Sequence, residues 1–172
     1  PAAPQNTTAL PAAALGEAIK RTAFAISREE SRYTLNGALL LIKPEGITLV
    51  ATDGHRLALQ VSGDGCQVLG KDEVRTLVPK AALVVLKALI EKRSEATPNT
   101  VVGFAQDDGH LYFRLGARTL ISRKLTGQFP NYEAVLPKEN NRVATVDAAA
   151  FARAVWDSLG TSYPPCGVEM RK

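Results

Sequence analysis

The sequence predicts an α+β fold in which a βαβββ unit occurs twice. Two helix-periodic segments are each followed by three strand-like runs, and an Asp-Gly-His turn interrupts the strands of both halves. The two turns begin at Asp53 and Asp108 and therefore lie 108 − 53 = 55 positions apart. Because strands joined by hairpins pair antiparallel, we expect two helices packed on antiparallel sheets.

The length and composition fit one domain and part of a second. The chain has 172 residues, of which 45% are hydrophobic, so enough apolar side chains are available for a buried core. No apolar run approaches the ~18 residues that a membrane helix needs. The chain begins at Pro1 and its single methionine is Met170, so we expect a piece of a longer protein.

Charge and cysteine content narrow the class of protein. The 21 basic and 17 acidic residues give a net charge of +4, which permits a nucleic-acid partner without requiring one. The two cysteines, Cys66 and Cys166, are far apart and form no CxxC pair, which argues against a disulfide scaffold or a zinc site. We therefore expect plain thiols and a cytoplasmic location.

The first half is predicted to hold a helix and three strands. Apolar side chains recur at helical spacing from Leu15 to Ile26, which predicts a helix over residues 11–28, preceded at 1–9 by a linker or frayed terminus. Strands are predicted at 38–42, 47–52 and 56–61. Asp53-Gly54 predicts a two-residue type I′ turn, because that turn needs positive φ at both central residues.

The second half repeats this order. A strand at 74–78 leads into a helix over residues 79–93, whose apolar face is predicted to be Leu83, Leu86 and Ile90. The strands that follow are predicted at 100–105, 111–115 and 118–125.

A third composition change near residue 142 predicts the start of another unit. Asp147 is expected to be the N-cap of a further helix, with an apolar face made of Ala150, Phe151, Ala154, Val155 and Leu159. Pro164-Pro165 must end that helix. We therefore expect a complete domain over residues 10–142 and the truncated start of a further domain over residues 143–172.

No constellation typical of catalysis is found. Walker-type phosphate loops, nucleophile elbows and metalloprotease motifs are absent from the sequence. His55 beside Asp53, or His110 beside Asp107 and Asp108, would be the candidates for a general base or a metal-dependent nucleic-acid hydrolase. Polar residues at the ends of hairpins are the simpler interpretation, so we expect no catalytic residue, no cofactor and no metal.

Three motifs carry most of the information. Residues 31–37 read SRYTLNG, residues 52–57 read TDGHRL and residues 129–137 read FPNYEAVLP. In this order and separation they closely resemble the middle domain of the bacterial DNA polymerase III β sliding clamps. The resemblance covers residues 10–142, and residues 143–172 resemble the beginning of the third domain of that family.

The resemblance implies a processivity factor without catalytic activity of its own. In that family three similar domains per chain and two chains per ring enclose double-stranded DNA, with helices lining the hole and sheets forming the wall. The implied partners are duplex DNA of any sequence, the catalytic subunit of DNA polymerase III, and clamp-loader and repair proteins that carry short peptide motifs. A homodimer ring with no membrane association is expected for the full-length family.

The two helices carry basic side chains that suit a surface facing phosphates. Residues 80–93 hold four basic side chains against Glu91, a net charge of +3. With the resemblance, the residues expected to face DNA are Lys20, Arg21, Arg28, Arg32, Tyr33, Lys80 and Lys87. Glu29 and Thr34 depart from the family pattern, which weakens the assignment around Arg32 and Tyr33.

The resemblance also implies a pocket for peptides of the Gln-Leu-x-Leu-Phe kind. The positions that match its wall are Leu35, Thr52, Gly54, His55, Arg56, Leu57, Pro130 and Val135. Leucine, proline and valine side chains would form an apolar depression, while Arg56 and His55 would frame its rim. The alternative from another class is a stand-alone peptide-binding adaptor or decoy that retains this wall but forms no ring.

Overall fold

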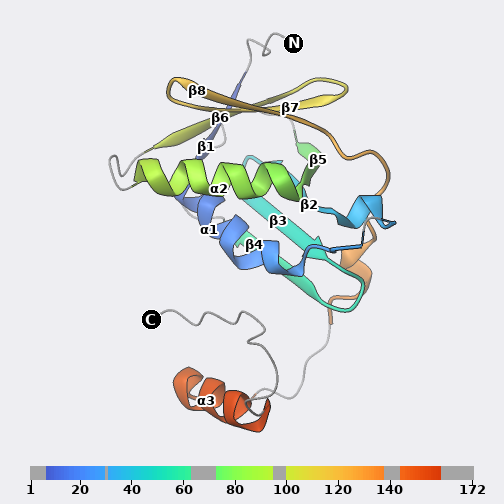
Figure 1. Ribbon diagram of the computed structural model, residues 1–172, viewed down its shortest axis with the longest axis vertical. Helices are drawn as coiled ribbons and strands as arrows, with labels where there is room; N and C mark the ends of the chain where they lie inside the picture. The colour runs from blue at the N-terminus through green and yellow to red at the C-terminus, as the bar shows by residue number, and fades with distance from the viewer. Residues whose placement is uncertain (1–6, 30, 63–72, 95–99, 138–143, 160–172) are drawn as a thin grey trace. The chain divides into compact units, whose positions relative to one another are not determined.

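The computed structural model describes residues 7–29, 31–62, 73–94, 100–137 and 144–159 and divides into two units, Pro1–Pro130 and Asn131–Lys172 (Figure 1). The elements of the first unit are β1 (Thr8–Pro11), α1 (Ala12–Thr22), β2 (Gly37–Lys43), β3 (Gly46–Thr52), β4 (Leu57–Ser62), β5 (Val74–Pro79), α2 (Lys80–Ser94), β6 (Val101–Gln106), β7 (His110–Leu115) and β8 (Arg118–Arg123). The order βαβββ thus occurs twice, which confirms the predicted duplication.

The two halves exchange their first strands. One sheet has the order β4-β3-β2-β5 and the other has the order β1-β6-β7-β8, and every pairing is antiparallel. The expectation of a linker or frayed terminus over residues 1–9 is wrong at its end, because Thr8 and Ala9 belong to β1 and pair with Phe104 and Gly103. The fully buried Leu10 explains this strand, since pairing with β6 takes its side chain out of water.

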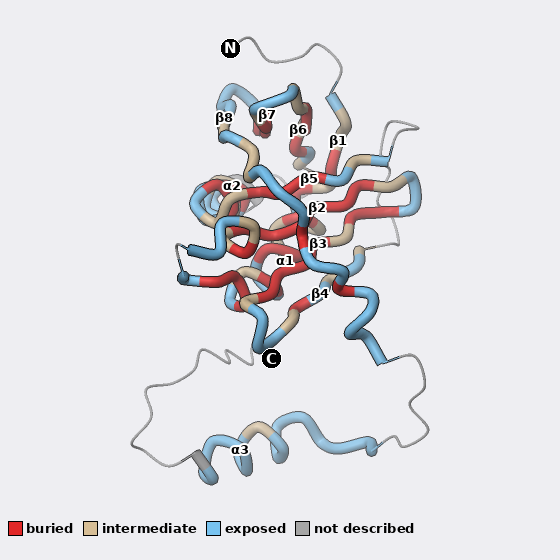
Figure 2. Tube along the Cα trace, turned by 90° about the vertical axis from the view of Figure 1, so that its right-hand side faces the viewer, coloured by how far each residue is buried: buried red, intermediate tan, exposed pale blue. Residues whose placement is uncertain are grey.

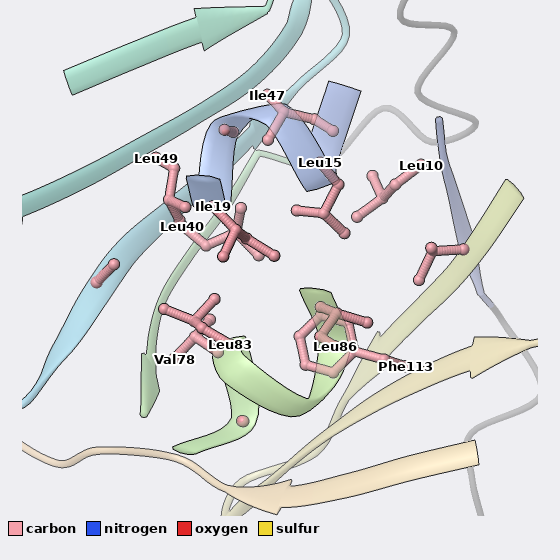
Figure 3. Packing of buried hydrophobic residues seen from close by; sticks show 14 of the residues in the cluster. Leu10, Leu15, Ile19, Leu40, Ile47, Leu49, Val78, Leu83, Leu86 and Phe113 are labelled. Atoms are coloured by element: carbon pink, nitrogen blue, oxygen red, sulfur yellow. The ribbon is translucent and has the colours of Figure 1, made fainter. Parts of the chain in front are cut away.

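Both helices pack into one core with the two sheets. α1 contacts α2, β3 and β4, and α2 also contacts β2, β5, β7 and β8. Figure 3 shows Leu15 and Ile19 of α1 close to Leu83 and Leu86 of α2, all of them nearly fully buried. The predicted apolar faces of both helices are therefore confirmed. Figure 2 shows the same distribution along the chain, with buried residues concentrated in β2, β3 and the inner sides of the helices.

The first helix is shorter than predicted. α1 ends at Thr22, a single 3-10 turn covers Ala23–Ala25, and Ile26 is extended with φ −70° and ψ 135°. The amide of Ser27 then donates a 3.0 Å hydrogen bond to the carbonyl of Leu35. Ile26 is still buried, so its side chain continues the apolar stripe although the backbone has left the helix. Pairing with the segment around Leu35 overrides the local helical period.

The number of residues between equivalent positions of the two hairpin loops differs from the 55 predicted from the repeated Asp-Gly-His sequence. In the first, Asp53 donates its amide to the carbonyl of Arg56, and in the second Asp107 does the same toward His110. The equivalent residues are thus 107 − 53 = 54 positions apart, so the repeated Asp-Gly-His string is out of register by one. The prediction of a two-residue type I′ turn is wrong as well. Asp53 does not have the positive φ that this turn requires, and the loop between the paired residues Thr52 and Leu57 has four residues and not two.

In the unit Asn131–Lys172, the described elements are a 3-10 turn at Tyr132–Ala134 and the α-helix α3 (Ala148–Leu159). The Oδ1 atom of Asp147 accepts a 2.7 Å hydrogen bond from the amide of Ala150, which confirms the predicted N-cap. Phe151 and Val155 of the expected apolar face are exposed. Cys66, Cys166, Pro164-Pro165 and the expected domain boundary at residue 142 lie outside the described residues.

Candidate peptide-docking loop and DNA-facing residues

The loop between β3 and β4 is organised around the side chain of Asp53. Its Oδ1 atom accepts hydrogen bonds of 3.0 Å from the amides of both His55 and Arg56, and its Oδ2 atom accepts one of 3.0 Å from Nε of Arg56. Thr52 adds two more, because its hydroxyl donates to the carbonyl of Arg56 at 2.7 Å and accepts from the amide of Gly54 at 3.1 Å. The two backbone amides lower the pKa of Asp53, which stays ionised.

Two long-range contacts join this loop to the rest of the domain. Nη1 of Arg32 donates a 3.2 Å hydrogen bond to the carbonyl of Asp53, and Nη2 of Arg56 donates one of 3.0 Å to the carbonyl of Phe24. The guanidinium of Arg56 also lies 5.7 Å from the centre of the Phe24 ring. Gly54 has φ of +90°, and a Cβ atom there would lie 2.8 Å from Nη1 of Arg32.

Most predicted pocket residues lie in or next to this loop. Thr52 is buried at the end of β3, Leu57 lies opposite it and is half-buried, and Gly54, His55 and Arg56 are exposed. Leu35 is buried on the 3-10 turn Tyr33–Leu35, directly after Arg32. Pro130 is exposed and follows the buried Phe129.

Val135 falls in the unit that begins at Asn131 and is 68% exposed. Its place in the pocket wall stays a prediction.

Several of the basic residues predicted to face DNA are neutralised by neighbours. On α1, Glu17 pairs with Arg21 at 2.7 Å and with Lys20 at 3.7 Å, and the hydrogen bond from Arg21 lowers the pKa of Glu17. On α2, Nζ of Lys87 lies 3.5 Å from Oε1 of Glu91.

The remaining DNA-facing candidates differ in their surroundings. Nε of Arg32 lies 2.9 Å from Oε2 of Glu29. Arg28 and Lys80 form no ion pair with any residue in the described ranges. Tyr33 is 72% exposed and therefore accessible to a ligand.

The structure also shows features that sequence reasoning missed. The exposed side of α2 carries Val84 and Val85, which are 56% and 45% exposed, between its basic residues. Phe24 is 55% exposed and lies under Arg56. Asp53 was expected as a turn residue and considered as a catalytic candidate, but the role of its carboxylate in holding the loop together was not predicted. Asp directly before Gly is a local signal for a turn in which the Asp side chain accepts hydrogen bonds from the backbone amides that follow it. This signal could have shown the role of Asp53.

The carboxylates proposed for a hydrolase do not suit that role. Asp53 and Asp107 lie on hairpins of two different sheets. Asp107 accepts hydrogen bonds from the Tyr112 hydroxyl at 2.6 Å and from the amides of Gly109 and His110, and the pKa of its carboxyl falls to about 2, mainly because of Tyr112. Among the described residues, no group of three or more His, Cys, Asp and Glu side chains could hold a metal ion.

Comparison with solved structures defines the class of protein. The crystal structure of the Caulobacter crescentus beta sliding clamp with a bound polyethylene glycol aligns with a TM-score of 0.73 and 34% identity, over 88% of this chain and 40% of that chain. The Pseudomonas aeruginosa sliding clamp bound to griselimycin aligns with a TM-score of 0.70 and 30% identity, over 82% and 36% of the two chains. The duplicated βαβββ fold is therefore that of the DNA polymerase sliding clamps.

Sequence comparison specifies the family further. Residues 9–131 match the model of the DNA polymerase III beta subunit, central domain. The beta sliding clamp of Synechococcus elongatus is 36% identical over 151 residues, which cover 88% of this chain and 39% of that protein, and the clamp of Caulobacter vibrioides is 36% identical over 141 residues. The chain belongs to the bacterial DNA polymerase III beta subunit family, as the sequence motifs predicted. It spans about two-fifths of the length of these relatives.

Proposed function

We propose that this chain supplies the central domain of a DNA replication processivity clamp, part of a homodimeric ring that encircles duplex DNA and tethers DNA polymerase III. We further propose that its β3–β4 loop forms one wall of a pocket for short peptide motifs on the polymerase, the clamp loader and repair proteins. The chain acts by binding and not by catalysis, in the cytoplasm. The domain limits are part of this proposal: the central domain begins with β1 at Thr8 and extends to residue 142, and the start of the next domain covers residues 143–172.

The observation that carries the proposal is the match of residues 9–131 to the central domain of the family, combined with the ordered TDGHRL loop. A loop fixed by five side-chain hydrogen bonds within residues 52–56 presents Leu57 in a defined place. A few apolar anchors in a defined place are how short peptides obtain most of their binding free energy. None of the described helices is long and apolar enough to cross a bilayer.

The DNA-facing part of the proposal rests on the helices. Arg28 and Lys80 are left without an ion pair among the described residues, so they are the strongest candidates for contacts with phosphates. Lys20, Arg21 and Lys87 already have acidic partners and would contribute less to the attraction. Such contacts bind DNA without reading its sequence, as a sliding protein requires.

Titration of the chain with a fluorescent Gln-Leu-x-Leu-Phe peptide tests the pocket. We expect weak but saturable binding, because this chain carries one wall of the pocket, and we expect Leu57→Ala and Pro130→Ala each to weaken it. A peptide of the same composition in scrambled order is the control. Equal affinity of the two peptides, or unchanged affinity of both variants, would overturn the pocket assignment.

A further inference from the structure

We propose that Asp53 and Arg32 are positioning residues of the peptide-docking loop, which hold it in its binding shape before a peptide arrives. This inference rests on the proposed function of the loop and adds a role that the pocket residues themselves do not explain. Asp53 was not among the residues expected to line the pocket, and Arg32 was expected to contact DNA.

Asp53 connects every part of the loop. Its carboxylate binds the amides of His55 and Arg56 and the side chain of Arg56, while its own carbonyl accepts the bond from Arg32. Acceptors on both the side chain and the backbone of one residue thus fix the position of the chain on either side of Gly54. A loop held in this way needs little further ordering when a ligand binds.

Arg32 supplies the contact that comes from outside the loop. Its guanidinium bridges two acceptors, with Nε 2.9 Å from Oε2 of Glu29 and Nη1 3.2 Å from the carbonyl of Asp53. Two other positions show how tightly the same segment is enclosed. A Cβ atom on Gly54 would come within 2.8 Å of Arg32, and one on Gly127 within 2.6 Å of Thr34.

This enclosure places the segment 32–35 between the docking loop and the chain that leads to Pro130. The bridge from Arg32 therefore links a turn that ends in the pocket residue Leu35 with a loop that ends in the pocket residue Leu57. Loss of the bridge would loosen both of these anchors together.

The second hairpin offers a matched control within the same chain. Asp107 makes the same pair of bonds to backbone amides, at 2.8 Å to Gly109 and 2.6 Å to His110. Its outer oxygen is bound by Tyr112 of the adjoining strand and not by an arginine. Asp107→Ala therefore removes an equivalent set of hydrogen bonds from a loop of the other sheet, with no connection to the docking loop.

The test compares four variants of the 172-residue chain: Asp53→Ala, Arg32→Gln, Arg32→Lys and Asp107→Ala. Peptide affinity is measured with the fluorescent Gln-Leu-x-Leu-Phe peptide, and the exchange rates of the His55 and Arg56 amides are measured by NMR. We expect Asp53→Ala and Arg32→Gln to raise Kd roughly three- to tenfold, the range set by the cost of ordering one or two side chains. Arg32→Lys should restore part of the affinity, because lysine keeps the positive charge and has a longer side chain than glutamine with which to donate to the carbonyl of Asp53.

Amide exchange separates a positioning role from a general loss of stability. In Arg32→Gln the amides of His55 and Arg56 keep their acceptor on Asp53, so faster exchange there, with the rest of the domain unchanged, shows a loosened loop. Asp107→Ala should leave Kd unchanged even if it lowers the Tm as much as Asp53→Ala does.

The outcomes distinguish this inference from the function on which it rests. Peptide binding by the wild-type chain that is weakened by Leu57→Ala but unaffected by Asp53→Ala and Arg32→Gln overturns the positioning role alone. Equal losses in Asp107→Ala and Asp53→Ala overturn it as well, because the effect would then follow stability. If the wild-type chain does not bind the peptide, the proposed function and this inference both fail.

Discussion

The hydroxyl of Tyr112 donates a 2.6 Å hydrogen bond to Oδ2 of Asp107, and the two side chains shift each other's pKa in opposite directions. The pKa of Asp107 falls from 3.8 to about 2, and that of Tyr112 rises above its ordinary value of 10.0. Both shifts have the same cause, since the bond requires an ionised carboxylate and a neutral phenol.

The pH dependence of unfolding tests this pair. A carboxyl with a lowered folded-state pKa stabilises the protein above its unfolded pKa of 3.8 and loses that contribution as the pH falls toward 2. We therefore expect Tyr112→Phe to lower the urea midpoint at neutral pH, with the difference from wild type shrinking in acid. Tyr33→Phe, at an exposed position, is the control and should change nothing. A difference that stays constant down to pH 2 would contradict the assignment.

Leu86 tests the shared core beneath the two helices. It is 1% exposed, and its replacement by alanine should lower the free energy of unfolding by about 2–5 kcal/mol, because a cavity is left behind. Val84 lies on the same helix but is 56% exposed, so Val84→Ala should change the free energy of unfolding by about 0.5 kcal/mol or less. Chemical denaturation of both variants measures the contrast. Similar effects of the two substitutions would mean that the buried face of α2 is assigned wrongly.

Gly37 tests the packing between β2 and β5. A Cβ atom there would lie 2.2 Å from the carbonyl oxygen of Val78, a backbone atom that cannot move without disturbing the sheet. We expect Gly37→Ala to lower the free energy of unfolding by about 1–3 kcal/mol. At Gly109 the same Cβ would meet no atom within 4 Å, which makes Gly109→Ala the matched control. The Tm values from thermal unfolding measure the contrast. A lower Tm for Gly109→Ala than for Gly37→Ala would refute this packing.

Salt-dependent binding to duplex DNA tests which face meets the phosphates. Each phosphate contact contributes about 0.9 to the slope of log affinity against log salt, so Lys80→Ala and Arg28→Ala should each reduce that slope by about 0.9. Lys20→Ala should reduce it less, because Glu17 already neutralises part of that charge. Fluorescence anisotropy at several salt concentrations measures the slopes.

The sheets provide the control for this experiment. Arg114 on β7 is exposed and forms no ion pair with any residue in the described part of the chain, but it lies on a sheet and not on a helix. If DNA faces the helices, Arg114→Ala leaves the slope unchanged. If Arg114→Ala reduces the slope as much as Lys80→Ala does, our proposal assigns DNA to the wrong face of the domain.

The parts of the fold that could be predicted are those with a local periodic signal. Leu83, Leu86 and Ile90 follow the helical period, and the buried strands appear as apolar runs between turns. β1 could not be predicted because its four residues become a strand only through β6, which lies some ninety positions later in the chain. The repeated Asp-Gly-His sequence gave an alignment of the two hairpins that is wrong by one position. In the second hairpin the backbone amides of Gly109 and His110 donate to Asp107 and not to Asp108, the Asp of the repeat.

The site shows the same division between local and long-range signals. Motif resemblance was enough to propose the loop between β3 and β4 as a docking loop, because TDGHRL is a local string. The bond from Arg32 to Asp53 joins residues 21 positions apart, and that from Arg56 to Phe24 joins residues 32 positions apart. Neither hydrogen bond has a sequence pattern of its own. The sequence therefore predicted only ligand contacts for Arg32 and Arg56, and not the hydrogen bonds that their side chains donate within the domain.

An NMR titration of the isotope-labelled chain with the Gln-Leu-x-Leu-Phe peptide tests the central claim most directly, since it shows where the peptide binds. We predict that the largest shifts occur at the amides of Gly54, His55 and Leu57 and in the turn Tyr33–Leu35, and that they saturate together. Shifts centred instead on the Asp107 loop or on α2, or no shift at any peptide concentration, would contradict the account of this chain as the docking domain of a sliding clamp.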